Sequence, residues 1–198
     1  MKQLIIYIIS YFIGTISGAY LVGNKFLDTD VRKYGSGNAG TTNAIRVLGK
    51  KWGVITFVID FLKGSIVTFI VKYVLKQNDL TVVISILLAV IGHDFPYYMK
   101  FKGGKGVATT MGALAVFNFK LTFIAWAIWM AAAIITKIAS IASLGFFAAI
   151  IVLFNCFSHN TIDVNIVITI TALLGILRHK ENIKRLIAGN ENKIGVGK

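Results

Sequence analysis

Acidic residues, proline and cysteine are scarce in this sequence. Its 198 residues include eight Asp and Glu, one proline and one cysteine, Cys156. A lone cysteine excludes an intramolecular disulfide, and since Cys156 lies in an apolar run with no histidine beside it, nothing marks it as a nucleophile. The eight acids are scattered and offer no carboxylate cage for Mg²⁺. With little proline, no internal repeat and no low-complexity stretch, residues 1–198 are expected to form one domain.

Apolar residues, by contrast, are abundant. They make up 56% of the chain, whereas soluble domains are about 45–50% apolar. They form long runs separated by short basic connectors, a pattern typical of membrane spans of about 20 residues each. We predict an all-α, polytopic membrane domain with seven apolar segments: residues 4–23, 52–75, 80–98, 105–118, 121–137, 138–158 and 163–178. Segment 105–118 is short, and is either a half-span or a re-entrant piece.

The N-terminal segment imitates a signal peptide, because Lys2 is followed by an apolar stretch and small residues. Similar apolar runs fill the rest of the chain, so we interpret this segment as a retained first span. Within it, Gly14 and Gly18 have the spacing of small residues that let membrane helices pack closely.

The formal net charge is +13, a balance that in a soluble protein suggests nucleic acid as a partner. In a membrane protein, the tendency of basic loops to stay cytoplasmic is a competing explanation. If connector 24–51 is cytoplasmic and seven spans alternate, sixteen Lys and Arg lie on the cytoplasmic side and four outside, with Lys63 inside a span. This asymmetry predicts an outside N-terminus and a cytoplasmic C-terminus. No nucleic-acid partner is expected.

The first polar block, residues 35–46, contains the pattern G-x-G-x-x-G. A dinucleotide site would need a preceding strand and a βαβ unit, whereas here membrane helices are expected on both sides. The simpler interpretation is an anion site. Glycines let the backbone approach an anion, Ser36, Asn38 and Asn43 supply hydrogen bonds, and Arg46 supplies a two-pronged donor.

The second polar block, residues 92–109, is a glycine-rich turn that leads into a helix. Free N–H groups at the helix start, together with Lys102 and Lys105, are typical of an anion site. It is not a Walker A loop, because Gly106 stands where Ser or Thr is required. A flexible basic turn is the alternative.

The third polar block, residues 178–191, is basic and helical in pattern. On one helix, Arg178, Asn182 and Arg185 would share a face, with His179 within a turn of Asn182. The alternative is a solvated basic helix at the membrane interface.

Two further groups of polar residues fall within predicted spans. Asp60 and Lys63 are spaced as an i, i+3 pair, and form either a structural ion pair or a wall of the polar site. Ser140 and Ser143 begin the sixth apolar segment; they supply either hydroxyl donors or helix packing.

In this order, the blocks closely resemble the motifs of the bacterial acyl-phosphate:glycerol-3-phosphate acyltransferase family, the PlsY type, over essentially the whole chain. The matching residues are Asp30–Arg32 and Gly35–Arg46 for the first motif, Gly92–His93 and Phe95–Thr109 for the second, Arg178–His179, Asn182–Ile183, Arg185–Leu186, Gly189 and Glu191 for the third, and Asp60, Lys63 and Gly64 for an intramembrane Asp-x-x-Lys-Gly. Thr41, Lys137 and Asn190 depart from the usual pattern, and a proline often seen near Ser17 is missing. None of these departures removes a proposed donor.

The resemblance implies transfer of a fatty acyl group from acyl phosphate to the 1-hydroxyl of glycerol 3-phosphate, giving lysophosphatidic acid and phosphate. It implies an enzyme of the bacterial cytoplasmic membrane with its active site on the cytoplasmic face, membrane lipid around it, and no obligate protein partner. Acyl phosphate is already activated, so no metal or cofactor is expected. The residues expected to be catalytic are Ser36, Lys105, His179 and Asn182. Those expected to bind substrate are Asn38, Asn43, Arg46, Lys102, Gly103, Gly104, Gly106, Ser140, Ser143 and Arg185. Those expected to support the site are Asp60, Lys63, His93 and Glu191.

Several alternatives stay open at this point. The proton of the attacking hydroxyl passes to His179 or to a substrate phosphate, and an acyl-Ser36 intermediate competes with direct attack. The rival class of protein is a transporter of organic phosphate anions. Structural repeats around a midplane site are typical of such transporters, and the sequence has no repeat.

Overall fold

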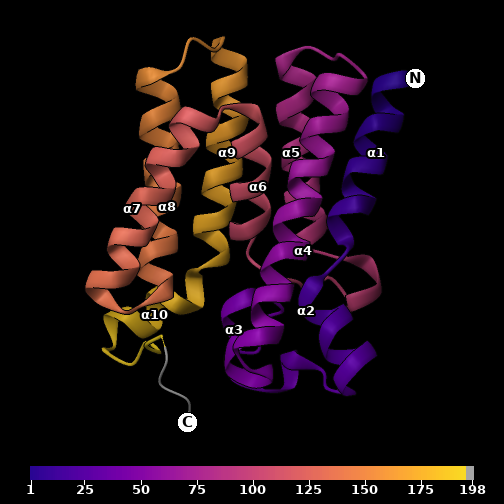
Figure 1. The fold of residues 1–198 in the computed structure, drawn as a ribbon. Helices are drawn as coiled ribbons and strands as arrows, with labels where there is room; N and C mark the ends of the chain where they lie inside the picture. Colours follow the sequence, from indigo (N-terminus) through magenta and orange to yellow (C-terminus); the bar gives the residue numbers. More distant parts are fainter. Residues whose placement is uncertain (195–198) are drawn as a thin grey trace. The chain divides into compact units, whose positions relative to one another are not determined.

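In the computed structural model, which describes residues 1–194, the chain is helical and that stretch contains no strand (Figure 1). The predicted all-α class is therefore confirmed. The chain divides into two compact units, Met1–Phe117 and a second unit that begins at Asn118. They are called unit 1 and unit 2 below. That both belong to one domain stays a prediction.

Unit 1 has four long or medium helices that carry the apolar segments, joined by short helical turns. Its elements are α1 (Lys2–Thr15), α2 (Gly18–Tyr20), η1 (Leu21–Phe26), η2 (Val31–Lys33), α3 (Thr41–Leu48), α4 (Lys50–Phe69), η3 (Ile70–Val74), α5 (Asp79–Asp94), η4 (Tyr97–Met99) and α6 (Val107–Phe117). Helix α4 is the centre of the unit, because it packs against α1, α2, α3, α5 and α6.

Close helix packing in unit 1 depends on glycine. A Cβ at Gly14 of α1 would overlap the backbone of Ala89 in α5, and one at Gly18 would approach the backbone of Thr56 in α4. The predicted small-residue face of the first span is thus confirmed. Gly64 of α4 lies equally close to the backbone of Thr109 in α6. Such contacts let membrane helices gain van der Waals attraction where lipid offers no hydrophobic drive between them.

The first span is not a continuous helix. It was expected over residues 4–23, but α1 ends at Thr15 and the chain is extended at Ile16 and Ser17 before α2 begins. The Ser17 hydroxyl caps α2 by accepting from the Tyr20 N–H at 3.3 Å. Small and polar residues surround the break, at positions 14–18, but they were expected only to form a packing face.

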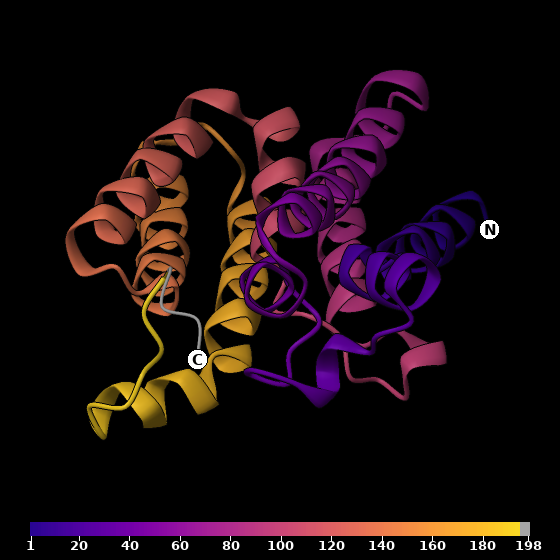
Figure 2. The same ribbon diagram turned by 60° about the horizontal axis from the view of Figure 1, so that its bottom comes forward.

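The polar blocks of unit 1 lie at one end of the unit. Figure 2 brings that end forward: α3 and the loop before it lie beside the loop that follows α5, opposite the end that carries the N-terminus. The link between the two loops is direct, because Arg32 Nη1 donates to the carbonyl of Met99 at 2.9 Å. Sequence blocks about 65 positions apart are therefore neighbours within unit 1.

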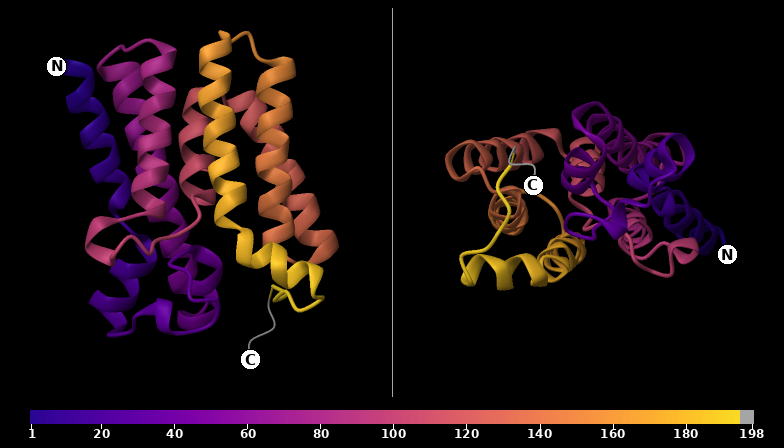
Figure 3. Two further views of the ribbon diagram at one scale, coloured as in Figure 1. Left: turned by 180° about the vertical axis from the view of Figure 1, so that it is seen from behind. Right: turned by 90° about the horizontal axis from the view of Figure 1, so that it is seen from below.

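Unit 2 contains three long apolar helices and one short basic one, and Figure 3 shows α8 next to both α7 and α9. The elements are α7 (Phe119–Thr136), α8 (Ala139–Phe157), α9 (Ile162–Arg178) and α10 (Lys180–Ile187). The core is aromatic: Phe146, Phe147 and Phe154 of α8 are fully buried. Asn118 starts α7 by accepting from the Leu121 N–H, and Lys137 ends it in a left-handed conformation.

Each of the seven predicted apolar segments is helical, the first with the break described above, but the helices are not equally long. Within residues 1–194, five helical stretches are long and apolar enough to cross a membrane, and a sixth is obtained if α9 and α10, bent by 53° at their junction, count as one span. Helix α6 has 11 residues, which is short of the roughly 20 that a full span needs. Large apolar side chains such as Ile135, Ile162 and Leu177 are exposed, as expected for surfaces that face lipid. The orientation of the chain in the membrane stays a prediction.

Candidate active site

Asn43 organises the first polar loop. Its side chain lies on α3 and is buried, and its hydrogen bonds go to the backbone of the loop before that helix. Its Oδ1 accepts from the Ser36 N–H at 2.8 Å, while its Nδ2 donates to the carbonyls of Val31 (2.8 Å) and Tyr34 (3.1 Å). The oxygen and the nitrogen of the Asn43 amide are therefore both used to stabilise the loop. One consequence is that the Ser36 backbone is fixed.

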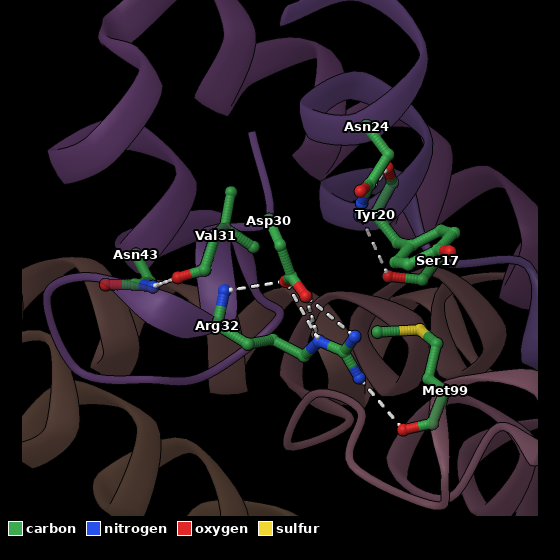
Figure 4. A network of polar contacts seen from close by, with 8 residues as sticks. All are labelled: Ser17, Tyr20, Asn24, Asp30, Val31, Arg32, Asn43 and Met99. Atoms are coloured by element: carbon green, nitrogen blue, oxygen red, sulfur yellow. Dashed lines mark hydrogen bonds and ion pairs between the residues drawn. The ribbon is translucent and has the colours of Figure 1, made fainter. Parts of the chain in front are cut away.

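An ion pair braces the same loop (Figure 4). Arg32 Nη2 lies 2.8 Å from Asp30 Oδ2. Arg32 also donates to the Met99 carbonyl, and its guanidinium lies over the ring of Tyr20. The side-chain hydrogen bonds from Arg32 hold the pKa of the Asp30 carboxyl below its ordinary value, and the same bonds raise the pKa of Arg32. Through the Met99 carbonyl, Arg32 connects the first polar loop to the segment just before the second polar loop.

The start of α3 has features that suit an anion. Gly40 precedes it without a side-chain cap, so the first N–H groups of the helix and its positive dipole end are not satisfied by a capping oxygen. Arg46 lies on the same helix, half-buried, next to Gly35, and makes no ion pair with any of residues 1–194. Ser36 and Asn38 are half-buried in the loop that leads to this helix.

The second polar loop is held down on α5 by its own glycines. The N–H groups of Gly103 and Gly104 donate to the carbonyls of Asp94 (3.1 Å) and His93 (3.0 Å). These two amides are therefore used within the protein, and glycine is needed there because of the close contact. Gly106 has a left-handed φ of 73° and precedes α6, whose first turn forms with Thr110 donating to Gly106 O.

Two lysines flank this loop. Lys102 is exposed and Lys105 is half-buried directly before Gly106. A cation at that place adds to the positive end of the α6 dipole, as an anion site requires.

A buried cluster lies below the second loop. Asp60 and Lys63 of α4 and His93 of α5 are each no more than 3% exposed. Lys63 Nζ is 3.1 Å from Asp60 Oδ1 and 2.7 Å from His93 Nδ1. The predicted Asp60–Lys63 ion pair is confirmed. Its contact with His93 links it to the residue that precedes the glycine turn.

In unit 2, His179 sits at the junction between α9 and α10 and is buried. Its Nδ1 lies 2.7 Å from the carbonyl of Gly175. Because a carbonyl only accepts, Nδ1 carries the hydrogen, and in the neutral ring Nε2 then holds the lone pair. The ring edge of His179 packs on Phe147. The imidazole is thus fixed in the tautomer that a proton acceptor needs.

Glu191 gathers the other polar side chains of unit 2. Its carboxylate accepts from Asn182 Nδ2 (3.2 Å to each oxygen) and from Arg185 Nε at 3.1 Å. The prediction that one helix would carry Arg178, Asn182 and Arg185 on one face is wrong, because the helix bends at His179 and leaves Arg178 on α9. Asn182 and Arg185 do come together, through Glu191.

The two serines of α8 differ. Ser143 donates to the carbonyl of Ala139 at 2.8 Å and lies 3.4 Å from Trp129 Nε1 of α7, contacts that belong to helix packing. Ser140 is buried, and within the described part of the chain its hydroxyl has no hydrogen-bond partner. It therefore keeps a donor for another group. Among residues 1–194 no cluster of three or more His, Cys, Asp and Glu is suited to a metal ion.

Some residues that shape the site were not singled out as site residues from the sequence. Asp30 and Arg32 had a signal, since they match the first motif, but their contact with Met99 crosses to another loop. Tyr98 lies within the second motif, but its contacts reach the first span: its hydroxyl donates to Thr15 O at 2.7 Å and accepts from Ser17 N at 3.3 Å, at the break in that span.

Taken by class, this is an integral membrane protein of packed helices, with glycine loops and uncapped helix starts suited to anions. Comparison with known proteins gives a more specific result. Residues 4–189 match the family model for glycerol-3-phosphate acyltransferase, and the chain belongs to that family.

Relatives are similar over nearly their whole length. The glycerol-3-phosphate acyltransferase of Fusobacterium nucleatum subsp. nucleatum is 42% identical, over 94% of this chain and 95% of that protein. That of Thermoanaerobacter sp. (strain X514) is 40% identical, over 95% and 93%. Crystal structures of PlsY (YgiH), an integral membrane glycerol 3-phosphate acyltransferase, are also similar. Its glycerol 3-phosphate form has a TM-score of 0.91 at 33% identity, covering 98% of this chain and 96% of that one. Its lysophosphatidic acid form has a TM-score of 0.87 at 32% identity, with the same coverage.

Proposed function

We propose that this protein transfers a fatty acyl group from acyl phosphate to the 1-hydroxyl of glycerol 3-phosphate, releasing lysophosphatidic acid and phosphate. Family membership supports the acceptor and the type of reaction. The observation that carries the proposal is Arg46, a half-buried guanidinium with no acidic partner in residues 1–194, on a helix whose start has no side-chain cap. Such a cation and such a helix start suit the phosphate that both substrates contain.

Within unit 1, the roles divide between the two polar loops. Lys105, Lys102 and the turn around Gly106 are assigned to the phosphate of glycerol 3-phosphate, with Arg46 assisting. Gly103 and Gly104 contribute by shape, since their N–H groups already donate to α5. Ser36 and Asn38 are assigned to the acyl phosphate, and Asn43 acts by fixing the Ser36 backbone.

The chemical step forms one bond and breaks one bond at the acyl carbon, and it transfers one proton. The 1-hydroxyl oxygen attacks the acyl carbonyl carbon, the carbon–oxygen bond to phosphate breaks, and phosphate leaves as the anion. His179 is assigned as acceptor of the hydroxyl proton, because its Nδ1–H is committed to Gly175. Asn182 is assigned as a donor to the carbonyl oxygen as negative charge develops there. The donor is already activated, so direct attack needs no acyl-enzyme intermediate.

The test is a reconstituted assay. Purified protein is incubated with acyl phosphate and glycerol 3-phosphate in the presence of a chelator, and lysophosphatidic acid and phosphate are measured. Equal amounts of both products are expected, and an acyl thioester should not replace acyl phosphate. Arg46→Ala should remove most of the activity, whereas Lys51→Ala, an exposed basic residue on α4, should not. Lysophosphatidic acid formed only from a thioester would contradict the proposed donor.

We further propose that the protein lies in the bacterial cytoplasmic membrane with its polar loops on the cytoplasmic side. The distribution of Lys and Arg supports this orientation. Single cysteines at Ser36, Lys102 and Lys184, in a background where Cys156 is replaced, should react with an impermeant thiol reagent from the cytoplasmic side alone. A cysteine at Lys76 is the control for the outer side. Labelling of Ser36→Cys from outside would contradict the orientation.

A further inference from the structure

The break in the first span leaves backbone groups that other elements satisfy. The carbonyl of Ile16 accepts from Lys63 Nζ, and the N–H of Gly18 donates to Asp60 Oδ1 at 3.1 Å. Within a membrane, such groups find no water and need a partner in the protein. The Asp60–Lys63 pair of α4 therefore completes the hydrogen bonding of the α1–α2 break.

The same pair also fixes the ring of His93. His93 Nδ1 lies 2.7 Å from Lys63 Nζ and 3.5 Å from Asp60 Oδ1. Because a charged ammonium group only donates, Nδ1 is the acceptor when Lys63 is protonated. In the neutral ring the hydrogen is then on Nε2. Asp60, 3.1 Å from Lys63 Nζ, holds the lysine in place. The three side chains are no more than 3% exposed, so this arrangement is shielded from competing water.

The other edge of the His93 ring supports the glycine turn. A Cβ built on Gly104 would overlap His93 Nε2 and would also lie 2.6 Å from Cε1 and 2.8 Å from Cδ2. The Gly104 N–H donates to the carbonyl of the same histidine at 3.0 Å. Any tilt of this ring therefore displaces the turn that leads into α6.

We propose that Lys63 and Asp60 are positioning residues for the glycerol 3-phosphate site, acting through His93 on the Gly103–Gly106 turn. If the pair only stabilised α4, its hydrogen-bond partners would lie on α4 itself. Here Asp60 accepts from Gly18 of the α1–α2 break, and Lys63 contacts Ile16 of the break and His93 of α5. The proposal rests on the proposed function for the identity of the ligand.

The first test compares two lysines of the same span. Lys63→Met removes the donor to His93, and should raise the KM for glycerol 3-phosphate by about tenfold, as loss of an orienting partner commonly does. The KM for acyl phosphate should change much less. Lys72→Met is the matched control, because Lys72 also donates to a backbone carbonyl, that of Phe117 at 2.7 Å, but has no contact with His93. Equal KM values in the two variants would overturn the proposal.

The second test keeps Lys63 and changes the ring. His93→Gln retains an acceptor for Lys63 and an N–H donor, whereas His93→Leu retains only bulk. Gln should keep the KM for glycerol 3-phosphate within about threefold of wild type, and Leu should raise it by about tenfold. If Leu performs as well as Gln, the ring acts only by filling space and the proposal is wrong. The two His93 variants test the proposal even if Lys63→Met does not fold.

Binding is measured alongside turnover to separate the two proposals. The dissociation constant of glycerol 3-phosphate is determined by calorimetry without acyl donor, for wild type and each variant. Wild type that binds glycerol 3-phosphate but makes no lysophosphatidic acid contradicts the proposed reaction alone. Binding that weakens in Lys63→Met but not in Lys72→Met still supports the positioning role. Unchanged binding in Lys63→Met and His93→Leu contradicts it.

Discussion

Unit 1 and unit 2 use their polar side chains differently. In unit 1, Arg32 and Asn43 donate to backbone carbonyls of the loops, and His93 carries the glycine turn. In unit 2, Asn182 and Arg185 bind the carboxylate of Glu191, and His179 is fixed by one carbonyl of its own helix. The contacts in unit 1 fix the backbone of the loops, whereas those in unit 2 orient functional groups. A methyl group added at Gly104 should therefore displace the turn of unit 1, and loss of the His179 imidazole should remove a functional group of unit 2.

The largest expected effect is in unit 2. His179→Ala removes the assigned proton acceptor and should lower kcat by about 10²- to 10³-fold with little change in the KM for glycerol 3-phosphate. The activity that remains measures how far a substrate phosphate can take the proton. His159→Ala, at an exposed histidine of the same unit, is the control. A raised KM with normal kcat in His179→Ala would mean that His179 binds substrate and performs no chemistry.

A smaller effect is expected from a methyl group in unit 1. Gly104→Ala places a Cβ on the His93 ring, so the turn must shift, and the KM for glycerol 3-phosphate should rise by about tenfold. Gly145→Ala is the matched control, because its Cβ would meet only Ile128 at 3.9 Å and alanine suits a helix. A selective rise in the KM for acyl phosphate would reverse the assignment of the two phosphates.

The smallest effect concerns the Asp30–Arg32 brace. Since Arg32 lowers the pKa of Asp30 in the folded protein, the pair contributes stability above the unfolded pKa of about 4 and loses it as pH falls through the folded value. Asp30→Asn should cost less than about 1 kcal/mol at neutral pH, because the pair is partly exposed. Thermal unfolding of both proteins between neutral and acid pH measures this. A difference that grows towards acid pH would contradict the sign.

The sequence was sufficient for the features that depend on local pattern. Apolar runs predict the helical segments that carry them, and glycines followed by an apolar helix predict the loops. It was not sufficient where contacts join distant residues. The break at Ile16 depends on Asp60 and Lys63, more than 40 positions away. The bend at His179 separates Arg178 from the face it was expected to share.

Asn43 is a similar case at shorter range. As an amide within a polar block it was expected to contact substrate, but its hydrogen bonds close the loop on itself. A sequence gives the donors and acceptors of a side chain, but not whether the backbone has already used them. The same holds for the N–H groups of Gly103 and Gly104, which α5 occupies.

The division of roles between the units is tested most directly by equilibrium binding without turnover. The dissociation constant of glycerol 3-phosphate is measured by calorimetry for wild type, Gly104→Ala and His179→Ala in the absence of acyl phosphate. Gly104→Ala should bind about tenfold more weakly than wild type, and His179→Ala should bind as wild type does. Weak binding by His179→Ala together with normal binding by Gly104→Ala would contradict the division.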